Sequence, residues 1–358
     1  MLNIKRLSII ASLLLLIGIV GSIATYKFIA KPESLTEKIE DDHFTDIEIS
    51  TNDGKIELVP TNEKNTRIEV SGHRLTDNFS AMVTNSTLSI SYQEKTKKFY
   101  SFGLAQNSAS MKIYIPRKSY HSIAVHANNG RLIVQELDAD DMILKANNGK
   151  ISASELKAKK IIVSAKDGSI DLQEIHSDEL NVKSNNGRIT ANSLSGTTIE
   201  LQAKDGSIDL QQIHSDELNV KSNNGRITAN SLRGTTFKLQ ANDGRIRLTD
   251  VAADSISLDS RNGKIELEDV TGALLAQAND GSINLTTDKL DHPIDFSTHN
   301  GKIHIQTNHE PIDTEIQAQA RNGSIKIFGK KESHAVFGTG ENIIDLSSND
   351  GRIIVEKQ

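Results

Sequence analysis

The chain has 358 residues, of which 36% are hydrophobic and 25% charged, and it contains neither cysteine nor tryptophan. The absence of cysteine excludes disulfides, thiolate metal sites, a cysteine nucleophile and a lipid-modified cysteine anchor. Residues 28–358 contain all 47 acids but only 38 of the 41 Lys and Arg, and the resulting net charge of −9 argues against a nucleic-acid-binding protein.

The N-terminus contains a candidate membrane anchor, residues 7–26, which are apolar or small and carry no charge. Twenty residues of helix rise about 30 Å, enough to cross the hydrocarbon core of a bilayer. Lys5 and Arg6 precede this stretch, so residues 1–6 should stay in the cytoplasm and the following domain should be exported. We therefore expect a single-pass protein of the cell membrane whose β domain is extracellular.

A cleaved signal peptide, with Ser22-Ile23-Ala24 as the cleavage site, is the alternative interpretation of this segment. We favour the uncleaved anchor, because the apolar stretch is longer than that of a usual signal peptide. Residues 27–44 are largely polar and read as a linker between membrane and domain.

From residue 45 onward, short runs alternate between apolar and polar side chains, as at Ile47 and Ile49. Alternation with a period of two predicts half-buried strands. We predict that residues 45–127 form degenerate N-terminal β coils that carry an insertion at residues 93–110. Residues 128–358 should form the regular β-solenoid repeats.

The regular part is marked by a glycine that returns about every 19 residues, always preceded by Asn or Asp and followed two residues later by Ile or Leu. These turn glycines are Gly130, Gly149, Gly168, Gly187, Gly206, Gly225, Gly244, Gly263, Gly281, Gly301, Gly323 and Gly351. Gly54 lies 76 residues before Gly130, which is four such periods. A fixed period in this range is the signature of a solenoid.

Within each period, apolar residues recur at fixed positions, which we count from the turn glycine as position 0. They stand at +2, +4, +7, +12 and +14, with polar residues between them. This pattern predicts two short strands per coil, near +1 to +5 and +11 to +16, stacked in parallel at about 4.8 Å. The fold class is therefore all-β, a parallel β-solenoid of about 19-residue coils behind an N-terminal transmembrane helix.

Asn-Gly is also a strong hairpin signal, so an antiparallel meander is the rival fold. A meander needs a tight turn after both strands, and the second connection here lacks a fixed Asn-Gly. At the first turn we expect glycine because it takes a positive φ without penalty, while the preceding Asn or Asp tolerates the left-handed region.

Two stretches, residues 165–202 and 203–240, are near copies of each other. The duplicated unit is 38 residues long, which is two coils. A chain that gains two coils without losing its fold uses length and surface repetition, which a single catalytic pocket would not need.

These features together resemble a known family. Residues 52–60 (NDGKIELVP), residues 111–116 (MKIYIP) and the repeated strand–Asn/Asp-Gly–strand units match it, as does the N-terminal apolar segment. The chain resembles the bacterial putative-adhesin family of β-strand-repeat proteins, and in particular its membrane-anchored LiaG type from Gram-positive cell-envelope stress operons. The likeness covers about residues 45–358 and implies a surface protein whose domain has no catalytic motif.

The edge formed by positions −2 to +1, which we call the turn edge, gathers positive charge. Its twelve cations are Arg131, Lys150, Lys166, Arg188, Lys204, Arg226, Arg245, Arg261, Lys264, Lys302, Arg321 and Arg352. Its five acids, all at −1, are Asp167, Asp205, Asp243, Asp280 and Asp350, which leaves a surplus of seven positive charges. We predict a track for an anionic polymer such as teichoic acid, or for phospholipid headgroups. The alternative is that Asn ladders and alternating charges merely stabilise the stack.

The candidate binding residues on this edge are Arg131, Lys150, Arg188, Arg226, Arg245, Lys264 and Lys302. The opposite corner collects acids, such as Asp140 and Glu179, but lysines interrupt their column, so a solvated face is favoured over a calcium site. A third candidate is the insertion, where Phe99, Tyr100 and Phe102 lie among lysines and form either a partner-binding loop or a flap over the first coils.

No catalytic, cofactor or metal motif is present in the sequence. We predict a non-enzymatic, adhesin-like cell-surface solenoid that presents a repetitive face to envelope polymers or to a protein partner. An accessory protein of a cell-envelope stress response is the first alternative. A polysaccharide-active β-helix enzyme is the second, and it would need carboxylates that converge on one groove.

Overall fold

The computed structural model describes residues 11–21, 33–72, 75–93 and 109–358. Residues 11–21 are helical, α2 (Leu75–Asn78) is a single turn, and strands and their connections make up the rest. No helix within these four ranges is long and apolar enough to span a membrane. The predicted anchor at residues 7–26 extends beyond the described helix at both ends, and it stays a prediction.

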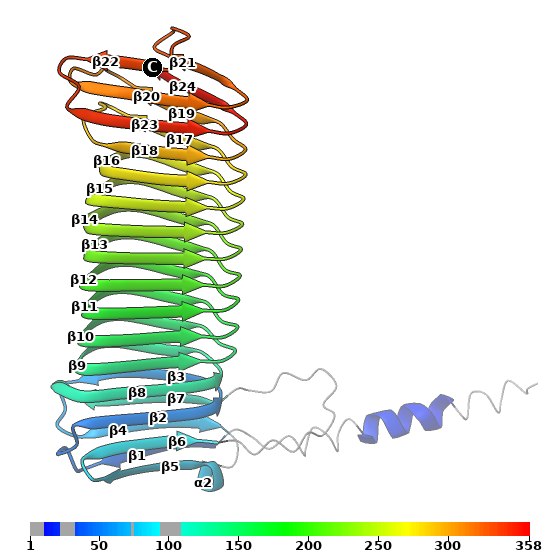
Figure 1. The fold of residues 1–358 in the computed structure, drawn as a ribbon. Coiled ribbons are helices and arrows are strands. Elements are labelled where there is room, and N and C mark those ends of the chain that lie inside the picture. The colour runs from blue at the N-terminus through cyan, green and yellow to red at the C-terminus, as the bar shows by residue number, and fades with distance from the viewer. Residues whose placement is uncertain (1–10, 22–32, 73–74, 94–108) are drawn as a thin grey trace, which may run out of the picture.

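The strands stack into a rod, a parallel β-solenoid of about 10 coils (Figure 1). Its regular middle consists of β9 (Leu132–Ala146), β10 (Ile151–Ala165), β11 (Ile170–Ser184), β12 (Ile189–Ala203), β13 (Ile208–Ser222), β14 (Ile227–Ala241), β15 (Ile246–Ser260) and β16 (Ile265–Ala278). Each strand pairs in parallel with the next one, and Ile151 lies opposite Ile170, one period later. The predicted parallel solenoid is confirmed, and the antiparallel meander is wrong for these coils.

Each regular coil contains one long bent strand where the sequence predicted two short ones. At position +6 the chain turns a corner with a positive φ of 52–56°, a conformation that is uncommon for residues other than glycine. The corner residues are Glu136, Glu155, Glu174, Ser193, Gln212, Ser231, Asp250 and Asp269. Pairing continues on both sides of the corner, so that Ser154 and Leu156 pair with the next coil while Glu155 does not.

The core contains the five predicted columns and two further columns of small residues. Positions +2, +4 and +7 are buried throughout the regular coils, and +12 and +14 are buried from β9 to β15. In β16 the register shifts by one residue, so that Leu274 and Ala276 are buried instead and Leu275 is exposed. Position +9, at a second corner, is always Ala, Ser or Gly, and a Cβ added to Gly196 would lie 2.0 Å from the carbonyl oxygen of Ser177. From β9 to β15, position +16 is Ala or Ser. Where it is Ser184, its hydroxyl donates to the Gly168 carbonyl at 3.1 Å and accepts from the Gly187 amide at 3.0 Å.

The turn glycines are required by the close approach of neighbouring coils. A Cβ added to Gly149 would lie 1.5 Å from the carbonyl oxygen of Gly130, and all twelve turn glycines show such a contact at 1.5–2.0 Å. None of the twelve has a φ in the left-handed region, whereas Gly54 does, at 114°. The expectation that a positive φ selects glycine at these turns is therefore wrong. The left-handed residue of each coil lies at +6 instead.

Shorter strands build the N-terminal end of the rod. They are β1 (Glu33–Ile39), β2 (Asp46–Asp53), β3 (Lys55–Thr61), β4 (Thr66–Gly72), β5 (Phe79–Thr84), β6 (Thr87–Tyr92), β7 (Ser110–Pro116) and β8 (Ser119–Asn129). The β2–β3 coil lies between the β8–β9 coil on one side and β6 and β7 on the other, and pairs in parallel with both. The antiparallel pairs β1–β4, β4–β7 and β5–β6 close this end.

The C-terminal end of the rod is built in a similar way, with one coil out of sequence order and an antiparallel strand at the end. Its strands are β17 (Ile283–Thr287), β18 (Ile294–Thr298), β19 (Ile303–Thr307), β20 (Thr314–Ala320), β21 (Ser324–Ile327), β22 (His334–Phe337), β23 (Asn342–Ser348) and β24 (Arg352–Lys357). The last coil, β23–β24, is inserted between β18–β19 and β20–β21, so the chain ends one coil inside the stack (Figure 1). Strand β22 caps β20 in antiparallel fashion.

Candidate functional site

The seven candidate cations of the turn edge form a row along one face of the rod, each one residue before the first buried residue of its coil. Arg131, Arg188, Arg226, Arg245 and Lys302 are exposed, whereas Lys150 and Lys264 are half-buried. The parallel register places them one above another, at about 4.8 Å per coil. The coils at Gly168, Gly206 and Gly281 carry serine in this row.

Two of these cations are neutralised by the coil that follows. Lys150 Nζ lies 3.0 Å from a carboxylate oxygen of Asp171, and Arg188 Nε lies 3.5 Å from one of Asp209. Both acids stand at position +3 of the next coil. Exposed pairs of this kind add little stability, but they cancel charge that an anionic ligand would otherwise meet.

Three cations converge on a single carboxylate further along the rod. Arg245, Arg247 and Lys264 approach the Glu266 carboxylate at 3.5, 2.7 and 2.6 Å, and we call these four residues the Glu266 cluster. The Glu266 side chain is only 16% exposed. Burial by itself would raise the pKa of Glu266, but hydrogen bonds from Lys264 and Arg247 outweigh it, and the pKa is lowered. Glu266 is therefore ionised at neutral pH, and the cluster has a net charge of +2.

Arg226 precedes this cluster by one coil and has no carboxylate partner among the described residues. The +3 position of the following coil, which held Asp171 and Asp209 in the earlier coils, is occupied by Arg247. Three cations therefore share the one acid at +3, and Arg226 is left without a partner. The sequence did not single out Arg247 and Glu266, because both stand at +3 and the turn edge was defined as positions −2 to +1. The break in the alternation Asp171, Asp209, Arg247 was the available signal.

The rest of the turn edge divides into free cations and a hydrogen-bonded ladder. Lys166, Lys204, Arg261 and Arg321, all at −2, are exposed and form no ion pair with a described carboxylate. The acids at −1 accept hydrogen bonds from the Asn of the adjacent coil, as Asp280 does from Asn300 at 2.6 Å. The −1 column therefore contributes to stacking, as the alternative reading of this edge expected.

The other two candidate sites from the sequence are the aromatic residues of the insertion and the acidic corner. Phe99, Tyr100 and Phe102 lie outside the described residues, and their role stays a prediction. At the acidic corner, Asp140 and Glu179 each pair with a lysine, Lys159 and Lys160, at 2.7 Å. A hydrogen bond from Lys159 lowers the pKa of Asp140. These carboxylates are thus used in ion pairs between coils.

A protein-family model matches most of the chain, in two overlapping stretches. The family model described as Toastrack DUF4097 matches residues 44–212 and 197–356, which together include both the irregular N-terminal coils and the regular rod. No curated protein matches the chain.

Solved structures with a similar arrangement come from several bacteria. A putative cell adhesion protein from Clostridium sporogenes is 11% identical, with a TM-score of 0.27 over 92% of this chain and 100% of that chain. A putative adhesin from Bacteroides fragilis is 15% identical, with a TM-score of 0.28 over 91% and 97%. A putative lipid binding protein from Parabacteroides distasonis is 15% identical, with a TM-score of 0.22 over 92% and 98%.

Proposed function

Because the chain belongs to the Toastrack DUF4097 family, we propose that it is a non-enzymatic cell-surface protein whose solenoid binds an anionic polymer of the cell envelope along the turn edge. The observation that carries this proposal is the concentration of Arg245, Arg247 and Lys264 around one carboxylate, that of Glu266, beside Arg226, which has no described carboxylate partner. Cations on successive coils, about 4.8 Å apart, suit a ligand whose negative charge repeats along its length.

The position of the surplus charge supports a binding role over a purely structural one. If the cations only stabilised the stack, each would be expected to meet an acid in the next coil, as Lys150 and Arg188 do. When position +3 is counted as well, it adds Arg247 and Lys326 to the cations and Asp171, Asp209 and Glu266 to the acids, so that fourteen cations face eight carboxylates. The remaining surplus of six lies on a chain whose formal net charge is −6, so it is a local feature.

The anchored, LiaG-like type is part of the same proposal. The charge-free residues 7–26 behind Lys5 and Arg6 support it, because they would hold the rod at the outer surface of the membrane. Strand β1 begins at Glu33, so the N-terminal end of the rod would lie close to that surface. A polymer within reach of the membrane, such as a membrane-linked teichoic acid, is the ligand this arrangement favours.

The test is binding of the full-length protein, in detergent micelles, to purified cell walls with and without their teichoic acid. Binding should require the polymer and weaken as salt rises, because exposed charges are screened. Replacing Arg226, Arg245 and Arg247 together by Gln should abolish it, while Lys264 remains to neutralise Glu266.

The matched control changes Lys183, Lys221 and Lys238 to Gln. These three lysines are exposed on the other face of the rod and form no ion pair with a described acid. The control removes the same charge and should bind as wild type does. If both variants lost the same amount of binding, the loss would be due to net charge alone. If the wild-type protein bound walls without teichoic acid equally well, the polymer would be excluded as the ligand.

A further inference from the structure

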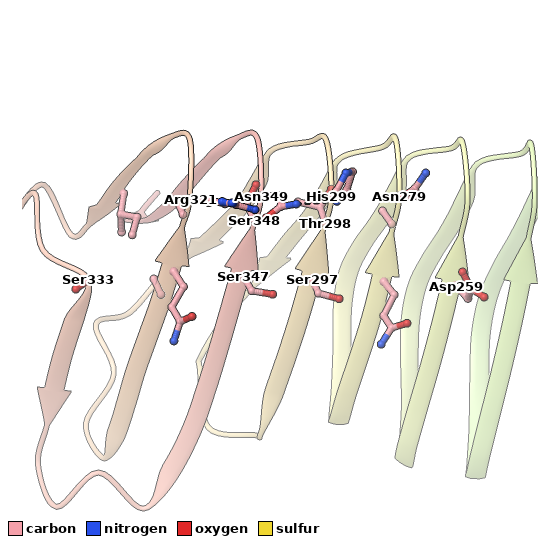
Figure 2. A pocket seen from close by; sticks show the side chains of 16 residues that line it. Asp259, Asn279, Ser297, Thr298, His299, Arg321, Ser333, Ser347, Ser348 and Asn349 are labelled. Carbon is pink, nitrogen blue, oxygen red and sulfur yellow. Dashed lines mark hydrogen bonds between the residues drawn. The ribbon is translucent and has the colours of Figure 1, made fainter.

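An open groove of about 870 Å³ lies at the C-terminal end of the rod, on the face that follows the second corner (Figure 2). Four side chains in direct register form its floor: Gln277 on β16, Ser297 on β18, Ser347 on β23 and Gln319 on β20. The groove exists because the last coil is inserted here, which places Ser347 of β23 between Ser297 and Gln319.

The order of side-chain lengths explains the hollow. Two short serines lie side by side, and a longer glutamine flanks them at each end. In the regular coils the same column mostly holds longer side chains, as at Lys183 and Gln202, and its one serine, Ser164, lies between two lysines. A second wall comes from the turn, where Asn349 Nδ2 lies 3.0 Å from His299 Nδ1. Figure 2 shows both rows, with Ser297 and Ser347 below His299 and Asn349.

The floor side chains are available for a ligand. Within the described chain, the side chains of Gln277, Ser297, Ser347 and Gln319 have no hydrogen-bond partner in the protein. Each hydroxyl or amide both donates and accepts. Four such neutral groups in a row, about 4.8 Å apart, suit a ligand that carries many hydroxyl groups, such as a sugar, better than they suit an apolar ligand.

The charges are placed at the two ends of the groove. Asp259 borders one end and accepts a hydrogen bond from Gln240 at 3.1 Å. Arg321 borders the other end, is exposed, and pairs with no described carboxylate. A single free cation suits one negative group, whereas a densely charged polyanion would meet Asp259 and a neutral floor.

We propose that this groove binds a short oligosaccharide that carries one carboxylate, with the carboxylate at Arg321 and the sugar hydroxyls on the serine and glutamine side chains. The groove volume is within the range of small-molecule sites, about 300–1,000 Å³. The site lies on a different face from the Glu266 cluster, so either one can fail while the other stands. It would be presented at the end of the rod opposite β1 (Figure 1).

The probes are the disaccharide cellobiouronic acid, which has one carboxylate, and cellobiose, which has a hydroxymethyl group in its place. Ligand-observed NMR titration of the full-length protein in detergent micelles should show both binding, with the acid about tenfold tighter because of its charge-assisted bond to Arg321. Arg321→Gln should remove that preference and leave the affinity for cellobiose unchanged. Absence of binding by both sugars, or a preference that survives Arg321→Gln, would overturn the proposal.

A second variant tests the floor. Ser297→Gln combined with Ser347→Gln levels the hollow and should lower the affinity for both sugars at least about tenfold. Ser164→Gln is the matched control, because Ser164 occupies the same column between Lys145 and Lys183, far from the groove. The variant in which Arg226, Arg245 and Arg247 are replaced by Gln should bind both sugars as wild type does. Equal binding by the levelled and control proteins would contradict the assigned site.

Discussion

The duplicated coils and the coils that follow them share one backbone and differ in surface charge. In the duplicated residues 165–240, Arg188 meets Asp209 across the coil boundary. In the next coils the corresponding acid is replaced by Arg247, and three cations crowd onto Glu266. The columns at +2, +4 and +7 are buried in both regions. Stacking therefore constrains the buried residues of each coil, whereas the charged residues on its surface can change from coil to coil.

The largest effect is expected where a side chain enters the space between coils. Gly206→Ala would place a Cβ 2.0 Å from the Gly187 carbonyl oxygen, and we expect a loss of at least about 3 kcal/mol in the free energy of unfolding. Gly329→Ala is the control, because Gly329 has a φ of 84° but no atom within 4 Å of an added Cβ, and it should cost about 1–2 kcal/mol. Denaturant midpoints compare the two. A smaller loss for Gly206→Ala would disprove the close-approach argument.

A smaller loss is expected from the serine at +16. Ser222 is fully buried, and its hydroxyl donates to the Gly206 carbonyl at 3.0 Å and accepts from the Gly225 amide at 2.9 Å. Ser222→Ala should destabilise by about 1–2 kcal/mol, because it leaves the Gly206 carbonyl and the Gly225 amide without that partner. Ser164→Ala, at a half-buried hydroxyl without a protein partner, should leave the thermal midpoint unchanged. A negligible shift for Ser222→Ala would mean that water replaces the serine.

A third substitution tests whether a cation at +3 in the duplicated coils increases polymer binding. Asp209→Arg removes the acid that neutralises Arg188 and gives this coil the charge found at position +3 of the next two-coil unit. Affinity for teichoic-acid-bearing wall should rise roughly tenfold at low salt, which corresponds to about 1.4 kcal/mol. Thr228→Arg, which adds a cation at +3 without removing an acid, separates charge gain from loss of the pair. Unchanged binding by both variants would argue against a continuous track.

The smallest effect concerns two stacked acids at the C-terminal end, Asp295 and its register partner Asp345. Burial, together with the charge of Asp345, raises the pKa of Asp295, while Leu275 and Gln317 complete the row. An acid with a raised folded-state pKa favours folding when it is protonated, so its contribution is lost as pH rises through that pKa. Asp295→Asn should stabilise the protein at neutral pH by less than about 1 kcal/mol and flatten this dependence. A decrease in midpoint at pH 7 would contradict it.

The repeat itself was predictable because its signals are periodic. Apolar residues at fixed positions predicted the inward columns, and the rule survives as residues change from Ile199 to Phe237 between the copies. The bend at +6 was missed because glutamate, serine and glutamine carry no mark of a left-handed φ. The glycine at the turn was predicted for the wrong reason, since a sequence shows that a small residue is needed without showing which atom excludes a larger one.

The insertion of each terminal coil into the stack was beyond the sequence for a different reason. Nothing local distinguishes β23 from a strand that follows β20 in order, because its pairing with β18 joins residues that are fifty positions apart in the chain, such as Ile294 and Ile344. The groove depends on that insertion, since Ser347 lies beside Ser297, fifty residues earlier. The Glu266 cluster, by contrast, was within reach, because Asp171, Asp209 and Arg247 are every second member of one column.

The most direct test of the account is a single substitution, Arg247→Asp, which restores the acid of the earlier coils and gives Arg226 a partner. Binding of the full-length protein to teichoic-acid-bearing cell wall is measured at low salt beside wild type, with thermal midpoints as a check on folding. The account predicts about a tenfold loss of affinity at an unchanged midpoint. If a folded Arg247→Asp protein bound the wall with wild-type affinity, the polymer would not bind at Arg247 and its neighbouring cations.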